Sequence, residues 1–308
     1  MGEIGMQVRF WGVRGSVASP GRDTVVYGGN TACLELRLSG SDRVIIIDAG
    51  SGIRGLGAHL IRSCSGPIEA EIFLTHTHWD HIMGFPFFDP IYRPNTRLKV
   101  HGPITYEEDT LDRIVGDQLS YRYFPVRHSE LSAAISYHQL REEELRFSDG
   151  LRVKTKYLNH SLLCLGYRFE RDGKVLCTGY DTEPFQNVFS DDPASPGYDP
   201  VVWEEGARAV ADANAALLDF FRGADILIHD AQYTMREYSN GKSGWGHSPM
   251  EHAIQTASAA GVKKVVLFHH DPDRRDDELQ ALEKTFRAAQ PSGGPEILVA
   301  REGMLLSV

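Results

Sequence analysis

Three histidines and one aspartate occur within six positions of the sequence, in the stretch FLTHTHWDHIMGF at residues 73–85. His76 and His78 end an apolar run, and side chains two apart on a strand point the same way. Asp80 and His81 follow on the next turn. Imidazole and carboxylate groups are ligands for zinc, manganese and iron. One ion cannot easily use all four groups, so we predict two ions, with one pair of residues on each.

Two metal ions need more donors, and the chain offers them where other apolar runs end. His160 lies in YLNHSLLCLGYRF, Asp181 in CTGYDTEP, and His269 and His270 end KKVVLFHH. Each of these residues alone reads more readily as structural. Together with the first cluster they become candidate ligands, and His269 and His270 compete for one role.

The order of these motifs resembles a known family. HTHWDH matches the HxHxDH signature of the metallo-β-lactamase-fold hydrolases, and GYDTEP, ILIHDAQYT, WGHSPMEHAI and VVLFHHDP are similar to later motifs of the tRNase Z and cyclic-phosphate phosphodiesterase branch. The glycine-rich FWGVRGSVASPG is similar to its opening hairpin. Tyr180 is inserted in the aspartate motif, and Asp230 replaces a glutamate. The resemblance covers roughly residues 7–272.

This resemblance implies an α/β protein, a four-layer αββα sandwich of the metallo-β-lactamase type, formed by residues 1–308 as one domain. It implies two divalent metal ions, with zinc as the first expectation and manganese or iron as alternatives. The ligand set it implies is His76, His78 and His160 on one ion, Asp80, His81 and His269 on the other, and Asp181 as a bridge. His269 is preferred over His270 because it directly follows the apolar strand. Asp48 in IIIDAG is expected to orient a ligand histidine.

The metals imply a mechanism. A hydroxide held between two cations is a nucleophile at neutral pH. Cleaving a phosphodiester also requires a proton for the leaving oxygen, and His247, held by Asp230, is the predicted donor. With Asp80, these two residues form the predicted catalytic set. We therefore predict a binuclear metal-dependent phosphodiesterase acting on a small phosphodiester, such as a cyclic nucleotide or another cyclic phosphate.

Three alternatives stay open. A tRNase Z-like endoribonuclease would need a long basic arm, and no such segment is visible. A lactonase or thioesterase would have less need for the Asp230–His247 pair. A non-catalytic metal-binding sensor would not need every ligand to be retained.

Substrate contacts are expected from two segments. Residues 117–131 supply Tyr121 and Arg122, which could stack on a base and hold a phosphate. Arg14 and Asn30, in the opening hairpin, could also reach the site.

Composition limits the partners and the compartment. The chain has 308 residues and a formal net charge of -10, which disfavours long nucleic acids. The four cysteines form no CxxC pair, which favours reduced thiols. No basic segment leads into a long apolar one, and no apolar run is long enough for a membrane span, so we expect a cytoplasmic protein. A homodimer is an open alternative.

Short apolar runs separated by turn residues predict strands at 7–13, 32–38, 43–50, 70–76, 97–102, 151–158, 162–170, 174–181, 224–230 and 263–270. Helices are predicted at 105–119, at 276–289, and from Ser248, the expected N-cap, to a stop at Gly261. Excursions from the sheets are expected near 104–138 and 187–206, the latter as an acidic surface loop.

Overall fold

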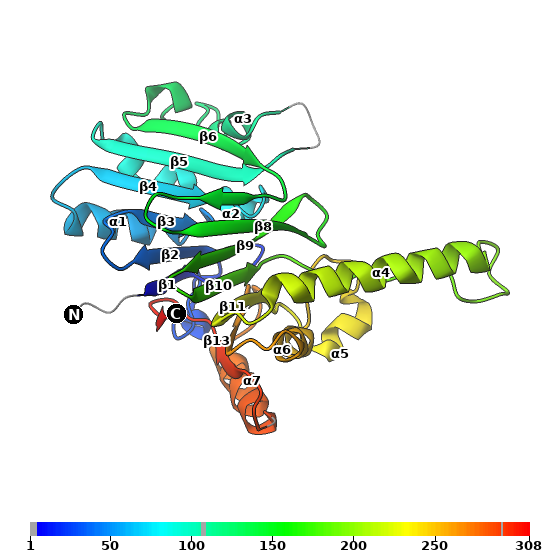
Figure 1. The fold of residues 1–308 in the computed structure, drawn as a ribbon. Coiled ribbons are helices and arrows are strands. Elements are labelled where there is room, and N and C mark those ends of the chain that lie inside the picture. Colours follow the sequence, from blue (N-terminus) through cyan, green and yellow to red (C-terminus); the bar gives the residue numbers. More distant parts are fainter. Residues whose placement is uncertain (1–4, 106–108, 291) are drawn as a thin grey trace.

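Two sheets pack face to face, and helices cover both outer faces, as Figure 1 shows for the computed structural model. The structure describes residues 5–105, 109–290 and 292–308. Each sheet has seven strands, in the orders β14-β1-β2-β3-β4-β5-β6 and β13-β12-β11-β10-β9-β8-β7. The predicted four-layer αββα arrangement is confirmed.

The first sheet joins the N-terminal half of the chain to its last strand. Its strands are β14 (Leu305–Ser307), β1 (Met6–Gly12), β2 (Cys33–Leu38), β3 (Val44–Ile47), β4 (Ile68–Phe73), β5 (Thr96–Pro103) and β6 (Ala134–Leu140). β3, β4, β5 and β6 run parallel. The carboxyl ends of β3 and β4 therefore meet at one edge of the sheet.

The second sheet likewise combines antiparallel and parallel strands. Its strands are β13 (Glu296–Val299), β12 (Lys264–Phe268), β11 (Ile226–Asp230), β10 (Lys174–Gly179), β9 (Cys164–Arg171), β8 (Arg152–Leu158) and β7 (Glu144–Arg146). β10, β11, β12 and β13 are parallel, whereas β7, β8, β9 and β10 pair antiparallel. The carboxyl ends of β10, β11 and β12 share one edge.

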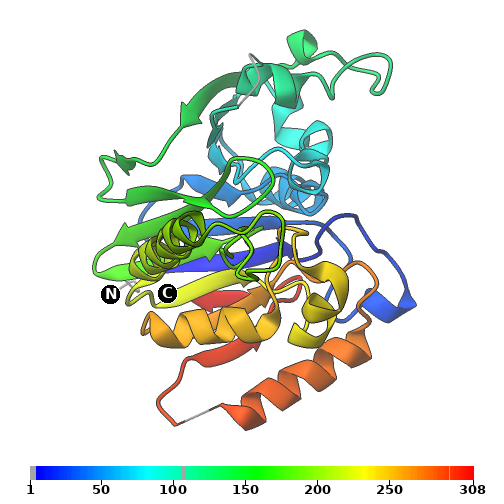
Figure 2. The same cartoon turned by 90° about the vertical axis from the view of Figure 1, so that its right-hand side faces the viewer.

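Helices close both outer faces, as a quarter turn of the view shows for the second sheet (Figure 2). α1 (Ile53–Ser63) and α3 (Leu111–Gly116) pack on the first sheet. α4 (Pro200–Phe221), α6 (Met250–Ala259) and α7 (Asp276–Ala289) pack on the second. The short helices are α2 (Trp79–Ile82) and α5 (Met235–Glu237), with single turns η1 to η5 at Arg22–Thr24, Phe85–Phe87, Asp89–Tyr92, His128–Glu130 and Tyr238–Lys242.

Central strands are apolar on both faces because each face meets another layer. In β3, Ile45 and Ile47 point into the core between the sheets, while Val44 and Ile46 face the helices of the first sheet. β12 divides in the same way. This explains why these segments read as unbroken apolar runs in the sequence.

Every predicted strand is present, but the predicted start of helix α6 is wrong. The helix begins at Met250 with Pro249 at its N-cap, not at Ser248. The hydroxyl of Ser248 instead donates to the carbonyl of Thr182, 2.6 Å away. Gly261 does follow the helix end, with φ +65°.

The two predicted excursions also differ from expectation. Of the helix predicted at 105–119, the structure forms Leu111–Gly116, and residues 106–108 lie outside the described part of the chain. The expected loop at 187–206 gives way to α4 at Pro200, where Asp199 accepts two backbone N–H bonds as N-cap. A proline at the first helical position is typical of helix starts. α4 extends well beyond the sheets (Figure 1).

In the described residues, no helix combines the length and the apolar character needed to cross a membrane.

Phe73 tests the core between the sheets. Its ring is fully buried and lies 5.4 Å and 5.6 Å, centroid to centroid, from the rings of Tyr167 and Phe169. Phe73→Ala should lower the free energy of unfolding by about 3–5 kcal/mol because it leaves a cavity between two rigid sheets. Denaturant titration of the metal-free protein measures this. Tyr123→Ala, at a side chain 74% exposed, is the control and should cost less than about 1 kcal/mol; equal losses would contradict the assigned core.

Candidate metal centre

The predicted site residues come from strand ends of both sheets and meet at one edge of the sandwich. Asp48 follows β3, His76 and His78 follow β4, Asp80 and His81 lie in α2, His160 follows β8, Asp181 follows β10, Asp230 ends β11, and His269 follows β12. Parallel strands bring these ends together although the residues span much of the chain.

The first cluster contains three imidazoles and one carboxylate. His78 Nδ1 lies 2.9 Å from His76 Nε2 and 3.1 Å from His160 Nε2. Asp181 Oδ2 lies 3.5 Å from His76 Nε2 and 3.8 Å from His160 Nε2. Four donor atoms therefore converge on one point.

The second cluster uses the other oxygen of the same aspartate. Asp181 Oδ1 lies 3.3 Å from both His81 Nε2 and His269 Nε2. Asp80 Oδ2 lies 3.1 Å from His269 Nε2 and 3.3 Å from His81 Nε2. The Asp181 carboxylate thus lies between the two clusters.

Both clusters fit a divalent cation by donor type and spacing. Ligand atoms about 2.1 Å from one zinc ion, in tetrahedral directions, are roughly 3.4 Å from one another. The distances within each cluster lie around that value. In addition, Asp181 Oδ1 is buried without a hydrogen-bond partner, which is costly for a carboxylate unless a cation neutralises it. The clusters are therefore consistent with a binuclear metal site.

Four of the histidines use their second ring nitrogen to contact the protein. His76 Nδ1 lies 3.1 Å from the Thr75 hydroxyl, His81 Nδ1 2.8 Å from Asp48 Oδ2, His160 Nδ1 3.0 Å from the Gly246 carbonyl, and His269 Nδ1 3.1 Å from Gln232 Oε1. Such partners fix the orientation of the ring and point the other nitrogen into the cluster. Asp48 lies where the sequence places it, beside a cluster histidine.

Buried carboxylates make the centre attractive to positive charge. Burial lowers the pKa of His81, but the carboxylates of Asp181, Asp80 and Asp48 raise it more, so its pKa lies well above the usual value. Burial keeps the pKa of His76 well below its usual value. In the absence of cations, a proton on His81 neutralises part of the negative charge of these carboxylates.

Backbone strain concentrates around this centre. Among the described non-glycine residues, five have positive φ, and four of these belong to the site or contact it: Ser16, Asp48, Asp181 and His269. The amide of Ser16 donates to Asp80 Oδ2 at 2.7 Å. Strained φ values of this kind persist only where surrounding structure enforces them, and they are common at functional sites.

The Asp230–His247 pair adjoins the second cluster. His247 Nδ1 lies 2.9 Å from Asp230 Oδ2, and both residues group with Asp181 and His269 as a third set of close donors. Burial lowers the pKa of His247, but the charge and hydrogen bond of Asp230 raise it more, to about 9. The fully buried Asp230 also accepts from the amides of Thr182 and Gln232.

The structure places His270 outside both clusters. Its Nε2 lies 2.8 Å from the carbonyl oxygen of Ala300, and burial lowers its pKa to about 3. Of the two competing histidines, only His269 is grouped with the other donors.

The expected substrate contacts are engaged elsewhere. Arg14 is fully buried, and its guanidinium donates to the carbonyls of Gly28, Asp271 and Arg274. The Asn30 side chain donates to Glu302 and accepts from Ser51. These two residues stabilise the opening hairpin, so the expectation that they reach a substrate receives no support.

The excursion residues make no contact with either cluster that the structure records. Tyr121 donates to Glu130, and the Arg127 guanidinium lies over its ring at 4.2 Å. Among the described residues, no recorded contact joins Arg122 to either cluster. Substrate binding by this segment therefore stays a prediction.

Glu183 is an important residue that sequence reasoning missed. Its two carboxylate oxygens accept from the amides of Gly244 and Gly246, at 2.7 Å and 2.9 Å. Gly246 in turn faces His160 through its carbonyl and precedes His247 in the chain. Glu183 therefore supports the loop that carries His247. Its position two residues after Asp181, at the end of an apolar strand, was the available signal.

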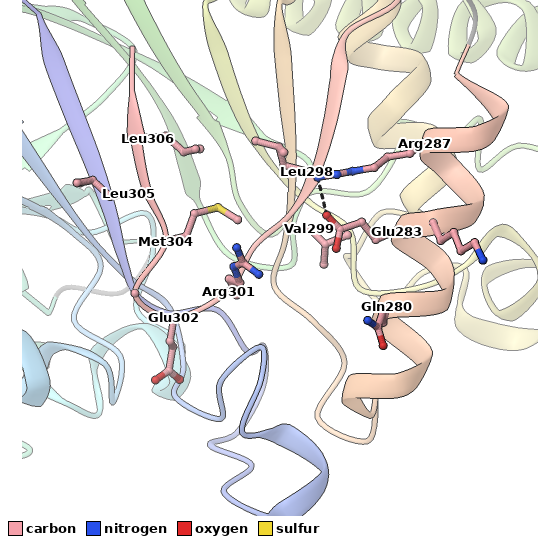
Figure 3. Close-up of a pocket in the computed structure, with 12 residues that line it drawn as sticks. Gln280, Glu283, Arg287, Leu298, Val299, Arg301, Glu302, Met304, Leu305 and Leu306 are labelled. Carbon is pink, nitrogen blue, oxygen red and sulfur yellow. Dashed lines mark ion pairs between the residues drawn. The ribbon is translucent and has the colours of Figure 1, made fainter.

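The most voluminous of the cavities described lies away from these residues. It occupies about 910 Å³ between α7 and the C-terminal strands, beside the ion pair of Glu283 and Arg287 (Figure 3). No residue of the clusters lines it. Cavity size therefore does not identify the site in this molecule; converging donor atoms do.

Comparison with known proteins supports the fold. No protein-family model matches the chain. The ribonuclease Z of Lactococcus lactis subsp. lactis (strain IL1403) is 26% identical over 295 residues, covering 86% of this chain and 88% of that protein. The metallo-β-lactamase fold protein YhfI from Bacillus subtilis matches with a TM-score of 0.65 at 16% identity, covering 99% of this chain and 100% of that chain. A diphosphatase from the PhnP family matches with a TM-score of 0.63 at 17% identity, covering 98% of each chain.

The chain has the metallo-β-lactamase fold and is distantly related to ribonuclease Z. The resemblance predicted from HTHWDH and the later motifs is thereby confirmed.

Gly15 tests the packing of the second cluster. A Cβ atom on Gly15 would lie 2.3 Å from His269 Cε1, so Gly15→Ala should push this ring out of the cluster. We expect at least one cation to bind about tenfold or more weakly, as measured by calorimetric titration of the metal-free protein. Gly66→Ala, where a Cβ meets nothing within 4 Å, is the control. Unchanged affinity in Gly15→Ala would exclude His269 as a ligand.

Proposed function

We propose that this protein is a binuclear metal-dependent phosphodiesterase that acts on a small phosphodiester. The observation that carries the proposal is the buried Asp230–His247 pair, grouped with the carboxylate that the two donor clusters share. Donor clusters alone fit any hydrolase of this fold. A raised-pKa imidazole beside them adds a proton donor, which a phosphodiester with a poor leaving group requires.

In this proposal, His76, His78 and His160 would hold one cation, Asp80, His81 and His269 would hold the other, and Asp181 would serve both. Asp48 orients His81 through the 2.8 Å contact described above. When bound, the two cations supply Lewis-acid stabilisation of the phosphoryl oxygens and activate water at neutral pH. Zinc, manganese and iron all suit these ligands.

His247 supplies the proton in this reaction. Its Nδ1–H donates to Asp230, so the second proton of the imidazolium lies on Nε2. As the bond between phosphorus and the leaving oxygen breaks, Nε2–H transfers its proton to that oxygen, and water provides the new oxygen on phosphorus. The attacking water releases one proton, and the neutral imidazole left after the transfer takes up a proton for the next turnover. Asp230 keeps the ring oriented and favours its protonated form.

A small substrate agrees with the charge of the molecule. The net charge is -10, and the segment before and within the start of α4 is acidic, with Asp191, Asp192, Asp199, Glu204 and Glu205. A long polyanion would be repelled by such a surface, whereas a compact diester carries little charge.

A tRNase Z-like endoribonuclease is the second candidate. The similarity to ribonuclease Z over 86% of the chain favours it. The same metal centre and acid would serve both reactions, because both break a phosphodiester bond. The candidates differ in what holds the rest of the substrate, so substrate size distinguishes them.

His247→Ala tests the proposed acid. The metal-loaded wild-type protein should hydrolyse both bis(p-nitrophenyl) phosphate and a cyclic nucleotide. The variant should lose about 10²–10⁴-fold in kcat on the cyclic nucleotide, whose alkoxide leaving group needs a proton, and little on the p-nitrophenyl ester. Steady-state kinetics on both substrates measures the difference.

His138→Ala, on the exposed face of β6, is the matched control and should leave both rates unchanged. Equal losses on the two substrates would remove His247 from the acid role. Turnover of a lactone without any diester hydrolysis would overturn the proposed function. Efficient cleavage of precursor tRNA with no small-diester turnover would establish the ribonuclease candidate.

The pH dependence tests the partnership with Asp230. Protonated His247 is present below its pKa, so activity on poor leaving groups should fall as the pH rises through that value. The high-pH limb of the pH–rate profile should lie at or below about pH 9. Bound cations lower the pKa of His247 because they oppose the effect of the nearby carboxylates. Asp230→Asn removes one opposite charge and should move the limb down by about 1–3 pH units, in pH–rate profiles of kcat. An unmoved limb would show that another group titrates.

A further inference from the structure

An exposed tryptophan next to the proposed acid is the feature that the proposed chemistry leaves unexplained. Trp245 is 60% exposed and lies two residues before His247. Large aromatic side chains are normally well buried because exposing them forfeits hydrophobic stabilisation. An exposed indole near a reaction centre is therefore a candidate binding element.

The backbone that carries Trp245 is fixed on both sides. Gly244 and Gly246 each donate an amide to Glu183, whose side chain is buried, and both have φ +83°. Only glycine adopts this conformation readily, so the sequence SGWGH encodes the loop shape. The indole is presented by an anchored loop, and a ligand would lose little affinity to ordering that loop.

The ammonium group of Lys242 lies over one face of the indole ring. Lys242 Nζ lies 4.0 Å from the Trp245 ring centroid and 5.5 Å from that of Tyr233. In the described part of the chain this ammonium forms no ion pair with a carboxylate. A positive charge on one face leaves the other face for an aromatic ligand and favours a ligand that carries negative charge.

One buried aromatic ring, that of Tyr233 at 2% exposure, contacts both Lys242 and the proposed acid. The Tyr233 ring packs edge-on against His247 at 6.2 Å between centroids, and it is the same ring that Lys242 approaches. Only Gly246 separates Trp245 from His247 in the chain, so their Cα atoms are at most about 7 Å apart. This spacing would allow one nucleoside to reach from a phosphorus atom beside His247 to a base on Trp245.

We propose that Trp245, with Lys242, is a stacking platform for a nucleobase, so that the substrate class is a nucleoside-bearing phosphodiester. This inference rests on the proposed function of the adjacent centre. Stacking on an indole accepts every base, so the platform selects for the presence of a base and not for its identity.

The test compares a nucleoside 2′,3′-cyclic phosphate with the corresponding cyclic phosphate of 1-O-methylribose, which lacks a base. Trp245→Ala should raise KM for the nucleoside substrate roughly tenfold or more, the order of one base–indole stack. KM for the base-free substrate should stay within about twofold, and kcat should change little on either. Trp245→Phe should be intermediate, and Trp203→Ala, in α4, should change neither KM.

Binding gives a second readout that does not depend on turnover. Adenosine 5′-monophosphate should quench the tryptophan fluorescence of the metal-loaded protein, and Trp245→Ala should weaken its binding about tenfold while binding of inorganic phosphate is retained. Equal KM increases on both substrates, or unchanged nucleoside binding, would overturn the platform. Absence of turnover on both substrates in the wild type would instead reject the proposed function and leave the binding result to be judged separately.

Discussion

A single buried carboxylate is the interaction on which the centre depends. Asp181 directs one oxygen toward His76 and His160 and the other toward His81 and His269. A charge with almost no exposure to water is costly unless opposite charge or hydrogen bonds surround it. Burial raises the pKa of Asp181, but His269, His81 and His76 lower it more, so the carboxylate stays ionised. The histidines and the carboxylate therefore stabilise one another, and a cation in each cluster would complete the balance.

The two sheets supply the rigidity that this arrangement needs. Strained φ angles at Asp48, Asp181 and His269 cost energy that only a well-packed framework can offset. Asp48 and His269 directly follow β3 and β12, and Asp181 lies one residue beyond the end of β10; all three strands are buried over their carboxyl-terminal halves. The strain places the side chains where regular strand geometry would not, while the strands prevent relaxation.

Much of the fold could be predicted from the sequence because its central strands are buried on both faces, as in β3 and β12, and other strands, such as β1 and β8, alternate. All ten predicted strands are present, whereas β6, β7, β13 and β14 were not predicted. The helices were harder to predict. α1 begins with IRGLG, where two glycines weaken the helical pattern, and α4 follows a segment rich in aspartate and proline. In both cases packing against a sheet, and not local propensity, determines the helix.

The site was predictable where its residues are close in sequence or follow strands. The HTHWDH motif is recognisable from its residue types and spacing alone. Asp181, Asp230 and His269 follow or end apolar runs. Ser248 was misread because its hydroxyl binds a carbonyl from a distant loop, which no local pattern reveals. Arg14 and Asn30, which the sequence places in the opening hairpin within possible reach of the substrate, have hydrogen bonds of their own in that hairpin, so their contact with a substrate stays a prediction. Side chains with several long-range partners are beyond inference from neighbouring residues.

The two backbone hydrogen bonds of Gly246 have a thermodynamic consequence. Its carbonyl faces His160 in the first cluster, while its amide is bound by Glu183, which also fixes the loop of Trp245. The position of that loop and the orientation of His160 are thus linked. Linkage is reciprocal, so a ligand that binds the loop and changes cation affinity must have its own affinity changed by the cation by the same factor. Metal and substrate would then act as mutual effectors, coupled through one glycine.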